Sequence, residues 1–295
     1  METIRRDLTC RIKSKKIEKI EIRKPKIVKN PAAYFRNQLA GSSFSDIKRI
    51  GKLLTFVFKN KKGEEKYLLI HLKMTGQLIY CDKKSFAAGG HANSREEEKK
   101  IREGDIREIC QEGKYTHVIL EFSDKSKLFF NDLRQFGYLK IVDGKTLEKT
   151  WSRFGIEPLQ ANFTFDNFKK IFQNRKTSVK ALLLDQNLIS GIGNIYADEI
   201  LFMAKVKPDR TADSLDGKEL KEIFKACGRI IKKAIEHRGT TFSDYLDATG
   251  EKGNFAGQLK VYGREKEKCK RCKRGIIQKI KVAGRGTRYC PVCQK

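Results

Sequence analysis

The sequence lacks any apolar stretch long enough to cross a membrane, because no segment approaches ~18 uninterrupted apolar residues. The N-terminus, METIRRDLTCRIKSKK, also lacks the apolar run and small-residue cleavage site of a secretory signal. Cysteine is scarce as well: eight cysteines in 295 residues are too few and too uneven for a secreted disulfide framework. These absences exclude the membrane and secreted classes and predict a cytoplasmic protein with no membrane partner.

Acidic residues are in short supply too. The chain has 64 Lys and Arg against 36 Asp and Glu, a formal net charge of +28. This excess is far beyond what solubility needs, and it predicts a polyanionic partner bound through phosphate contacts that release counterions. The imbalance is strongest in residues 264–295, which carry 12 Lys and Arg but only two acidic residues. Nucleic acid is therefore a better candidate than an anionic membrane surface.

The first half of the chain is expected to consist mainly of β-strands. Short β-branched and aromatic runs separated by turn residues predict strands at 15–22, 47–58, 66–72, 77–80, 116–122 and 127–130. One helix is expected over 32–39, with Asn30 as its cap and Pro31 in its first position. Residues 82–113 are polar and charged, and we expect a long exposed excursion there.

After Trp151 the hydrophobic period becomes that of helices, with amphipathic spacing over 165–172 and 220–234. From Phe255 onward, short β-like pieces surround two cysteine pairs. The fold class is therefore α+β and multidomain. We expect a β-rich domain over 1–145, a helical domain over 146–255 and a small metal-bound ribbon over 256–295.

Two CxxC pairs form the most specific motif in the sequence. They are separated by 17 residues. Each pair places two thiolates on one tight turn, and two such turns offer four sulfurs tetrahedrally to a single Zn²⁺ ion. A redox pair or two disulfides are the rival interpretations. The predicted zinc ligands are Cys269, Cys272, Cys290 and Cys293.

The segment between the cysteine pairs is expected to form a β-hairpin, with arms over 276–282 and 287–289 and a turn at Gly284-Arg285-Gly286. Glycines on both sides of one guanidinium make a turn that can carry Arg285 into a nucleic-acid groove. The alternative is an ordinary exposed turn arginine.

Glycines ahead of a predicted helix indicate a second set of phosphate contacts. In the segment Gly191-Ile192-Gly193-Asn194, backbone N–H groups and the side-chain amide of Asn194 are candidate donors to a phosphate oxygen. A nucleotide-binding loop is not expected, since no strand precedes the glycines and no GK[ST] follows them. Lys176 and Lys180, slightly upstream, are further candidate phosphate contacts.

The order and spacing of these motifs resemble the formamidopyrimidine-DNA glycosylase family, base-excision enzymes related to endonuclease VIII. The resemblance covers nearly the whole chain. It implies an N-terminal β-sandwich with flanking helices, a helix–two-turn–helix element that includes residues 191–199, and a C-terminal zinc ribbon. The motifs that carry it are Glu2-Thr3-Ile4-Arg5, Gly51-Lys52, His71 to Gly76, Asn131 to Gly137, Leu184-Asp185-Gln186, Gly191 to Glu199, Val261 to Arg264 and Gly284 to Gln294.

The resemblance implies a DNA glycosylase and AP lyase that removes oxidised purines, 8-oxoguanine and formamidopyrimidines, from damaged double-stranded DNA as a monomer. Such a base is unreachable inside the stack, so the nucleotide is flipped out. Met74, Arg134 and Phe136 match the family's wedge: a thioether and an aromatic ring fill the hole, and a guanidinium meets the orphaned cytosine. On their own, Met74 and Phe136 would more often be core residues.

Other positions match the family with some departures. Lys52 matches its basic residue at the lesion sugar and phosphate and is, with Arg285, a predicted catalytic residue. Residues 238–255 match the loop that closes over the extruded base. Tyr115 stands where a DNA-contacting histidine is usual, and Gln135 where a second arginine is usual. These departures concern single contacts with DNA and leave the expected fold unchanged.

The main departure is at the N-terminus. Family members start Met-Pro-Glu-Leu-Pro-Glu-Val-Glu-Thr, and the proline amine exposed by methionine removal is the nucleophile, because an α-amino group titrates near ~8 and a lysine near ~10. The adjacent glutamate handles protons. Here Met1-Glu2-Thr3 aligns with Val-Glu-Thr. The five absent residues span about 7 Å as helix or about 17 Å as strand, so we do not expect Met1-Glu2 to substitute.

The 295-residue chain is therefore expected to be catalytically inactive, although its family is enzymatic. A start codon GUG, which encodes the family's valine and is read as methionine when it initiates translation, would account for Met1; upstream codons would then encode the absent residues. The alternatives are a non-catalytic protein that binds lesion or abasic DNA, and a basic zinc-ribbon RNA-binding protein, which the Met74, Arg134 and Phe136 set disfavours. The expected location is the cytoplasm, in association with the nucleoid.

Overall fold

A computed structural model describes residues 1–90, 109–239 and 255–295. The chain forms two compact units, which are treated separately below. The N-terminal unit contains Met1–Trp151, and the C-terminal unit contains Ser152–His237 and Phe255–Lys295. None of the helices in these ranges is long and apolar enough to cross a membrane.

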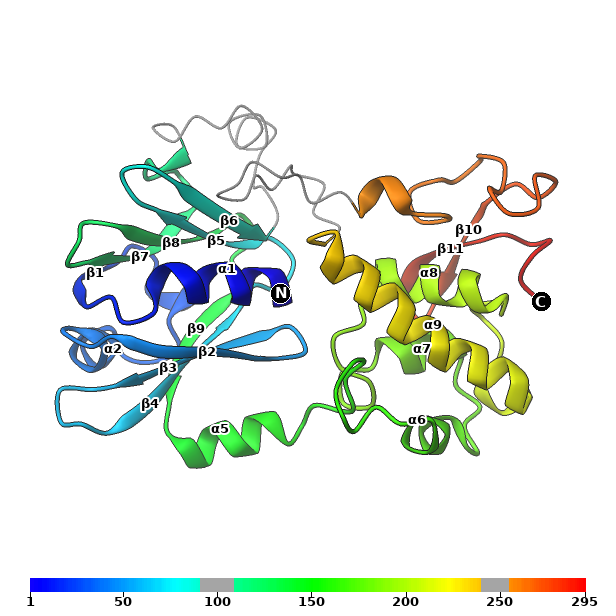
Figure 1. Ribbon diagram of the computed structural model, residues 1–295, viewed down its shortest axis with the longest axis horizontal. Coiled ribbons are helices and arrows are strands. Elements are labelled where there is room, and N and C mark those ends of the chain that lie inside the picture. Colours follow the sequence, from blue (N-terminus) through cyan, green and yellow to red (C-terminus); the bar gives the residue numbers. More distant parts are fainter. Residues whose placement is uncertain (91–108, 240–254) are drawn as a thin grey trace. The chain divides into compact units, whose positions relative to one another are not determined.

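The N-terminal unit is built on two antiparallel sheets (Figure 1). One sheet has the strand order β2-β3-β4-β9, formed by Phe44–Ile50, Leu53–Lys59, Glu65–His71 and Tyr138–Val142. The other has the order β1-β7-β8-β5-β6, formed by Ile17–Ile22, Thr116–Phe122, Lys127–Asp132, Gly76–Cys81 and Phe86–Gly90. The expected N-terminal β-sandwich is confirmed.

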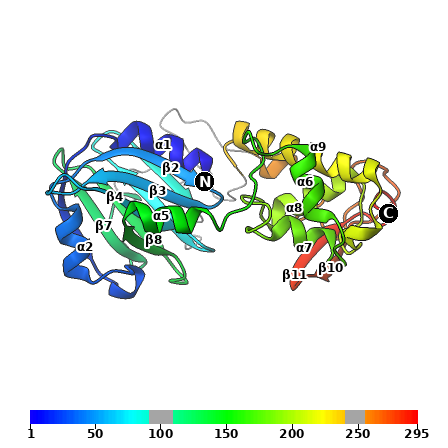
Figure 2. The same ribbon diagram turned by 90° about the horizontal axis from the view of Figure 1, so that it is seen from below.

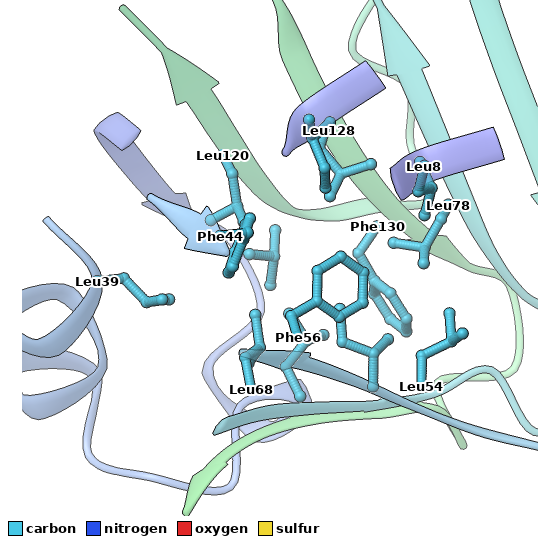
Figure 3. Packing of buried hydrophobic residues seen from close by; sticks show 14 of the residues in the cluster. Leu8, Leu39, Phe44, Leu54, Phe56, Leu68, Leu78, Leu120, Leu128 and Phe130 are labelled. Atoms are coloured by element: carbon cyan, nitrogen blue, oxygen red, sulfur yellow. The ribbon is translucent and has the colours of Figure 1, made fainter. Parts of the chain in front are cut away.

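The core lies between the two sheets. Phe56 from β3 and Phe130 from β8 are among the fully buried side chains there, together with Leu54 and Leu78 (Figure 3). Alternate residues of a strand point to opposite faces. Leu78 therefore faces this core, whereas the neighbouring Ile79 belongs to a separate small cluster on the outer face of the same sheet. Both faces of the five-stranded sheet are covered, which explains why β5 is buried along its whole length.

Helix α1 (Glu2–Ile12) contacts the edge strands β2 and β6, one from each sheet (Figure 1). It buries Ile4, Leu8 and Ile12, whose spacing of four residues places them on one face of the helix. A Cβ atom at Gly89 in β6 would lie 2.4 Å from Cγ1 of Ile4, so glycine is required where the helix packs on the strand. No helix was predicted for these residues from the sequence.

The predicted helix over 32–39 is confirmed as α2 (Ala32–Leu39), but Asn30 does not cap it. The Asn30 side chain donates to the carbonyl of Ile141 at 3.1 Å and accepts from the Ile141 N–H at 2.7 Å. It therefore satisfies backbone groups of β9, a segment 111 residues away. Within its described residues the unit also contains the short helices η1 (Pro25–Ile27) and α5 (Gly144–Trp151).

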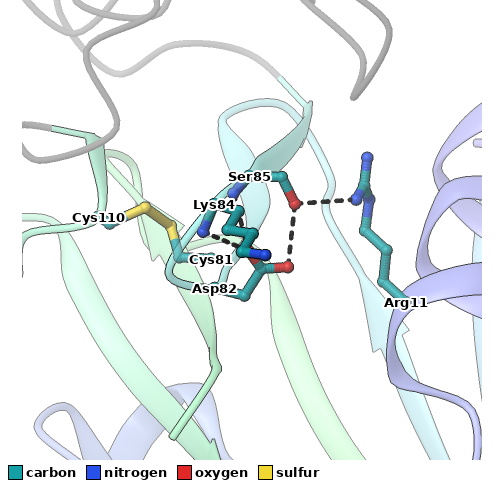
Figure 4. The surroundings of a disulfide bond; sticks show 6 residues. All are labelled: Arg11, Cys81, Asp82, Lys84, Ser85 and Cys110. Carbon is teal, nitrogen blue, oxygen red and sulfur yellow. Dashed lines mark hydrogen bonds between the residues drawn. A yellow bond between two sulfur atoms is a disulfide. The ribbon is translucent and has the colours of Figure 1, made fainter.

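The expected exposed excursion over 82–113 is partly wrong. Phe86–Gly90 form strand β6, which pairs with β5 and is largely buried. Cys81, at the end of β5, forms a disulfide with Cys110, with a Cα–Cα distance of 5.8 Å (Figure 4). No pairing of these two cysteines was predicted from the sequence. The rest of the predicted excursion, residues 91–108, lies outside the described residues.

Replacing Cys81 with serine should lower the free energy of unfolding by about 3 kcal/mol under oxidising conditions, because the disulfide closes a loop with a sequence separation of 29 residues. Urea denaturation measures the effect. With a reductant present, Cys81→Ser and the parent chain should unfold at nearly the same urea concentration. The matched control is Cys10→Ser, since Cys10 is an exposed free thiol of the same unit. Equal stability of parent and Cys81→Ser without reductant would show that the disulfide does not form.

The C-terminal unit is helical, with a small hairpin (Figure 2). The two predicted helices are confirmed as α6 and α9, and α9 starts at a capping box between Asp216 and Glu219. Helix α7 contacts α8, and β11 of the hairpin packs against α8. The elements are α6 (Phe165–Phe172), α7 (Val179–Leu184), α8 (Asn194–Ala204), η2 (Ala212–Ser214), α9 (Gly217–Glu236), η3 (Ala256–Gln258), β10 (Gln278–Val282) and β11 (Arg285–Tyr289).

Candidate nucleic-acid site and metal centre

Two loops of the N-terminal unit are joined by Asp132, which is fully buried at the end of β8. Its carboxylate accepts from the Thr75 hydroxyl on the β4–β5 loop, and from the backbone N–H groups of Arg134 at 3.2 Å and Gly137 at 2.7 Å on the β8–β9 loop. The Arg134 N–H also donates to the Thr75 hydroxyl at 3.0 Å. The two loops are thereby fixed relative to each other. No role was assigned to Asp132 from sequence, although it lies inside the Asn131–Gly137 motif.

These loops present the three predicted wedge residues together. Met74 is 53% exposed and Phe136 is 55% exposed, more than any other large hydrophobic side chain in the described part of the chain. The Arg134 guanidinium lies between them: Nη1 is 3.4 Å from the Met74 sulfur, and Cζ is 5.1 Å from the Phe136 ring centroid. A rigid loop pair that exposes apolar groups to water is typical of a binding surface.

Tyr115 lies directly behind the wedge loops. Its backbone carbonyl accepts from the Asp132 N–H at 3.0 Å, and its half-buried ring lies 5.9 Å from the Lys114 ammonium group. The buried His117 ring contacts the Asp132 carbonyl through Nε2 at 2.7 Å. The structure thus brings Tyr115 close to the loop that carries Arg134 and Phe136.

Three arginines hold the Glu2 carboxylate at the start of α1. Arg5 donates at 2.8 Å, Arg6 at 2.9 Å and Arg49 at 3.1 Å. Burial alone would raise the pKa of Glu2, but the hydrogen bonds from these guanidinium groups hold it at about 2. Glu2 therefore stays ionised at neutral pH and has no proton to donate.

The α-amino group of Met1 is close enough to Lys52 for the two charges to interact. Burial, and then the Arg49 charge, lower the pKa of this amine to about 6, and Lys52 adds to the effect. Burial, followed by the charges of Lys73 and Lys52, also lowers the pKa of His71 to about 4. His71 is consequently neutral at physiological pH, and its Nδ1 accepts from the Lys73 N–H at 2.9 Å. Lys52 thus lies among other positively charged groups near the start of α1.

In the C-terminal unit, the Gln186 side chain organises the glycine segment before α8. It donates to the Ile192 carbonyl at 2.8 Å and accepts from the Gly191 N–H at 3.0 Å. Gly191 has φ = 90°, a conformation that favours glycine. Gly193 is the N-cap of α8, and the Asn194 side-chain amide donates to the Gly286 carbonyl at 3.0 Å on the hairpin.

Lys176 and Lys180 are in different environments. Lys176 is exposed, whereas Lys180 is fully buried and forms an ion pair with Asp198 at 2.6 Å. Arg285 is exposed, but the predicted turn at 284–286 is wrong. The turn is the pair Ala283–Gly284, both with positive φ, and Arg285 is the first residue of β11, opposite Val282.

The four predicted metal ligands come together in the C-terminal unit. Their sulfur atoms all lie within 4.8 Å of one another, with 3.7 Å between Cys269 and Cys293 and 3.8 Å between Cys272 and Cys290. A tetrahedral site with Zn–S bonds of about 2.3 Å separates its sulfurs by about 3.8 Å. Backbone N–H groups of Arg271 and Gly275 also donate to the Cys269 and Cys272 sulfurs. The donor set therefore fits one structural Zn²⁺ ion.

The predicted loop over 238–255 falls mostly outside the described residues, which exclude 240–254. The structure therefore places the wedge residues and Tyr115 on one pair of neighbouring loops, and Lys52 beside the N-terminus. It places Asn194, Lys180 and the hairpin around a second centre in the C-terminal unit. Asp198, the buried partner of Lys180, was not singled out from sequence, because its role depends on a hairpin about 90 residues later.

Three family models match successive parts of the chain. The formamidopyrimidine-DNA glycosylase N-terminal domain matches residues 1–139, and the formamidopyrimidine-DNA glycosylase H2TH domain matches residues 154–245. The zinc finger found in FPG and IleRS matches residues 266–295. The order of the three is that of the sandwich, the helical part and the four-cysteine ribbon.

Similar proteins match over full length. Formamidopyrimidine-DNA glycosylase of Heliobacterium modesticaldum is 39% identical, covering 100% of this chain and 98% of that protein. The Desulfitobacterium hafniense protein of the same name is 38% identical, covering 100% and 97%. Lactococcus lactis Fpg in complex with DNA containing an abasic site has a TM-score of 0.83 at 30% identity, covering 100% of this chain and 97% of that one. A Lactococcus lactis Fpg variant bound to Fapy-dG DNA gives 0.84, with the same identity and coverage.

Proposed function

This chain belongs to the formamidopyrimidine-DNA glycosylase family, and from that premise we propose that it recognises oxidised purines in double-stranded DNA through the residues described above. The family chemistry is base excision followed by AP-lyase strand cleavage. The observation that carries the proposal is the wedge: Met74 and Phe136 are solvent-exposed apolar side chains on loops that Asp132 holds rigid.

The wedge residues act on the duplex when the damaged nucleotide leaves the stack. An apolar ring inserted at a base step partly unstacks it, and the vacated space must be filled. Phe136 supplies the ring, and Met74 supplies a flexible thioether that adapts to the gap. Arg134, held over the Phe136 ring, offers its guanidinium to the base opposite the lesion.

Basic and polar groups hold the phosphates. Lys52 serves the lesion sugar and phosphate, and Tyr115 stands beside the wedge loops as a further DNA contact. In the C-terminal unit, Lys176, the backbone N–H groups at Gly193 and the Arg285 guanidinium contact the backbone. The Zn²⁺ ion bound by the four cysteines supplies no chemistry; it fixes the ribbon that carries Arg285.

Phe136→Ala should abolish discrimination between damaged and undamaged DNA while leaving most of the general affinity. We expect the parent chain to bind an 8-oxoguanine or abasic-analogue duplex about tenfold or more tighter than the undamaged duplex, and Phe136→Ala to reduce this ratio to near one. Fluorescence anisotropy at several salt concentrations measures both affinities. The electrostatic part should remain, with log Kd rising steeply with log salt for both proteins.

The matched control is Tyr34→Ala, because Tyr34 is also an exposed aromatic residue of the N-terminal unit, on α2 and outside the wedge loops. It should leave the ratio unchanged. Equal losses of affinity for damaged and undamaged duplex in Phe136→Ala would contradict the wedge assignment. Tighter binding of structured RNA than of lesion duplex by the parent chain would contradict the proposed function as a whole.

A second candidate function, a non-catalytic binder of lesion or abasic DNA, is favoured by the N-terminus. Glu2 is held by three arginines and stays ionised, so it cannot act as a proton donor beside the first amine. We propose that this chain binds damaged DNA without cleaving it. We also propose that it acts as a monomer in the cytoplasm, associated with the nucleoid.

A further inference from the structure

The β10–β11 hairpin exposes Arg285, but the residues that follow Arg285 in β11 are held in place by contacts with the helices. Thr287 is fully buried, and its hydroxyl donates to the Arg285 carbonyl at 3.0 Å. Figures 1 and 2 both show β11 beside α8. The geometry of the Arg285 backbone is therefore set by what holds Thr287 and its neighbours.

The ammonium group of Lys180, on α7, is one of these anchors. It donates to the Thr287 hydroxyl at 2.7 Å, lies 3.5 Å from the Gly286 carbonyl, and pairs with the Asp198 carboxylate at 2.6 Å. A lysine ammonium group has three hydrogens to donate. All three of them have acceptors inside the protein, and the side chain has no exposed surface.

Asp198 and Asn194, on α8, hold the same segment from the other side. Asp198 accepts from the Arg288 N–H at 2.9 Å through the oxygen that does not face Lys180. Asn194 donates to the Gly286 carbonyl at 3.0 Å. Three side chains from two helices thus form hydrogen bonds with three consecutive hairpin residues directly after Arg285: Lys180 and Asn194 donate to Thr287 and Gly286, and Asp198 accepts from Arg288.

The buried Lys180–Asp198 ion pair is an inefficient way to stabilise a core. Burial lowers the pKa of Lys180 and raises that of Asp198 to about 6, each effect opposed by the partner's charge. Buried ion pairs often contribute little net stability compared with apolar residues, but removal of one partner leaves an uncompensated charge. A pair of this kind specifies geometry, and here the geometry it specifies is that of the hairpin.

We propose that Lys180 and Asp198 are positioning residues that fix the β10–β11 hairpin so that Arg285 meets the DNA backbone, and that Lys180 is not itself a phosphate contact. This inference rests on the proposed function for the role of Arg285, and replaces the prediction that Lys180 binds phosphate. Of the two lysines predicted to contact phosphate, the exposed Lys176 then keeps that role.

A double-mutant cycle with the zinc-loaded full chain separates the two roles. We expect Arg285→Ala and Lys180→Met each to weaken binding to an abasic-analogue duplex by about tenfold, and Lys180→Met to have almost no further effect in the Arg285→Ala background. Lys176→Met is the matched control. It should weaken binding by a smaller factor, and in the double variant this factor should multiply with the factor for Arg285→Ala. Multiplying losses for Lys180→Met as well would overturn the inference.

Hydrogen exchange of the β11 amides tests the anchoring without DNA. Lys180→Met and Thr287→Val, which removes the buried acceptor, should raise exchange at Arg285–Tyr289 while one zinc per chain is retained; Lys176→Met should not. If Lys180→Met alone does not fold, Lys180→Met/Asp198→Asn removes both buried charges and keeps an acceptor for Arg288 N–H, and it should show the same increase. Unchanged exchange in all three would overturn the inference even if lesion binding is intact. Conversely, increased exchange in these variants, together with a parent chain that shows no lesion preference, would uphold the anchoring and reject the proposed function.

Discussion

Borohydride should trap no covalent adduct between the 295-residue chain and an abasic duplex, whereas a chain extended by the family's N-terminus should be trapped efficiently. The extended protein carries Met-Pro-Glu-Leu-Pro-Glu ahead of valine in place of Met1. Methionine removal then exposes a proline amine, which is partly unprotonated at neutral pH and forms a Schiff base with the sugar carbon. We expect strand-cleavage rates to differ by on the order of 10³-fold or more, since nucleophile and proton-handling carboxylate are both restored.

The structure makes this prediction more specific, because the Met1 amine has a protonation state that would suit a nucleophile. Burial and Arg49 lower its pKa to about 6, so it is largely unprotonated at neutral pH. It differs from the family nucleophile in position, by five residues of chain. It differs also in its neighbour, because Glu2 is bound by three arginines with a pKa of about 2. We therefore expect the position of the Met1 amine, and not its pKa, to prevent it from reacting with the lesion sugar.

The control is the extended chain with one additional residue before the proline, which converts the proline nitrogen to an amide and lengthens the chain by that one residue only. It should bind the duplex like the extended chain and give no adduct. An adduct formed by the 295-residue chain and mapped by peptide sequencing to Met1 would contradict the prediction. It would show that the α1 N-terminus approaches the lesion sugar directly.

The features predicted correctly from sequence are those whose partners lie close along the chain or follow a period. The CxxC pairs predict four sulfurs, and the sulfurs come together. Amphipathic spacing predicts α6 and α9, and β-branched and aromatic runs between turn residues predict most strands of the sandwich. In each case the local pattern contains the physical reason for the structure.

The features missed depend on partners that are far away in sequence. Asn30 sits where a helix cap is expected, but β9 offers it two backbone groups and the helix begins without it. Cys81 and Cys110 look isolated because their spacing in the sequence does not show that the end of β5 and residue 110 lie close together in the fold.

Lys180 shows the same limitation at the candidate site. A lysine near a glycine-rich helix start is typical of phosphate binding, and the sequence offers no sign that it is buried. Its burial requires Asp198 on the next helix and Thr287 on a hairpin 107 residues later. By contrast, Met74 and Phe136 look like core residues by composition, and only the motif around them indicated the exposure that the structure has.

Removal of zinc should unfold the ribbon and weaken DNA binding while the helices of the C-terminal unit remain folded. Apart from the cysteines, the apolar cluster around the ribbon's described residues consists of Phe202, Val261 and Ile277, and Phe202 belongs to α8. Together with Val282 and Tyr289, which are also buried, these few apolar side chains cannot offset the conformational entropy of ordering the segment. Metal binding, worth about 10–16 kcal/mol in comparable small sites, must supply the difference.

Cys290→Ser is the sharpest variant, because Cys290 is fully buried and its sulfur is 3.8 Å from that of Cys272. Purified, reduced parent chain should contain one zinc per chain, and Cys290→Ser close to none. Far-UV circular dichroism should retain the helical signal, since α6 to α9 form their own apolar core. Affinity for DNA should fall by more than the loss caused by Arg285→Ala, because Arg285 and the surrounding ribbon lysines are released together.

The control is Cys10→Ser, which replaces an exposed thiol in the other unit and should leave zinc content and affinity unchanged. Less than about half an equivalent of zinc in the parent chain would contradict a structural metal centre.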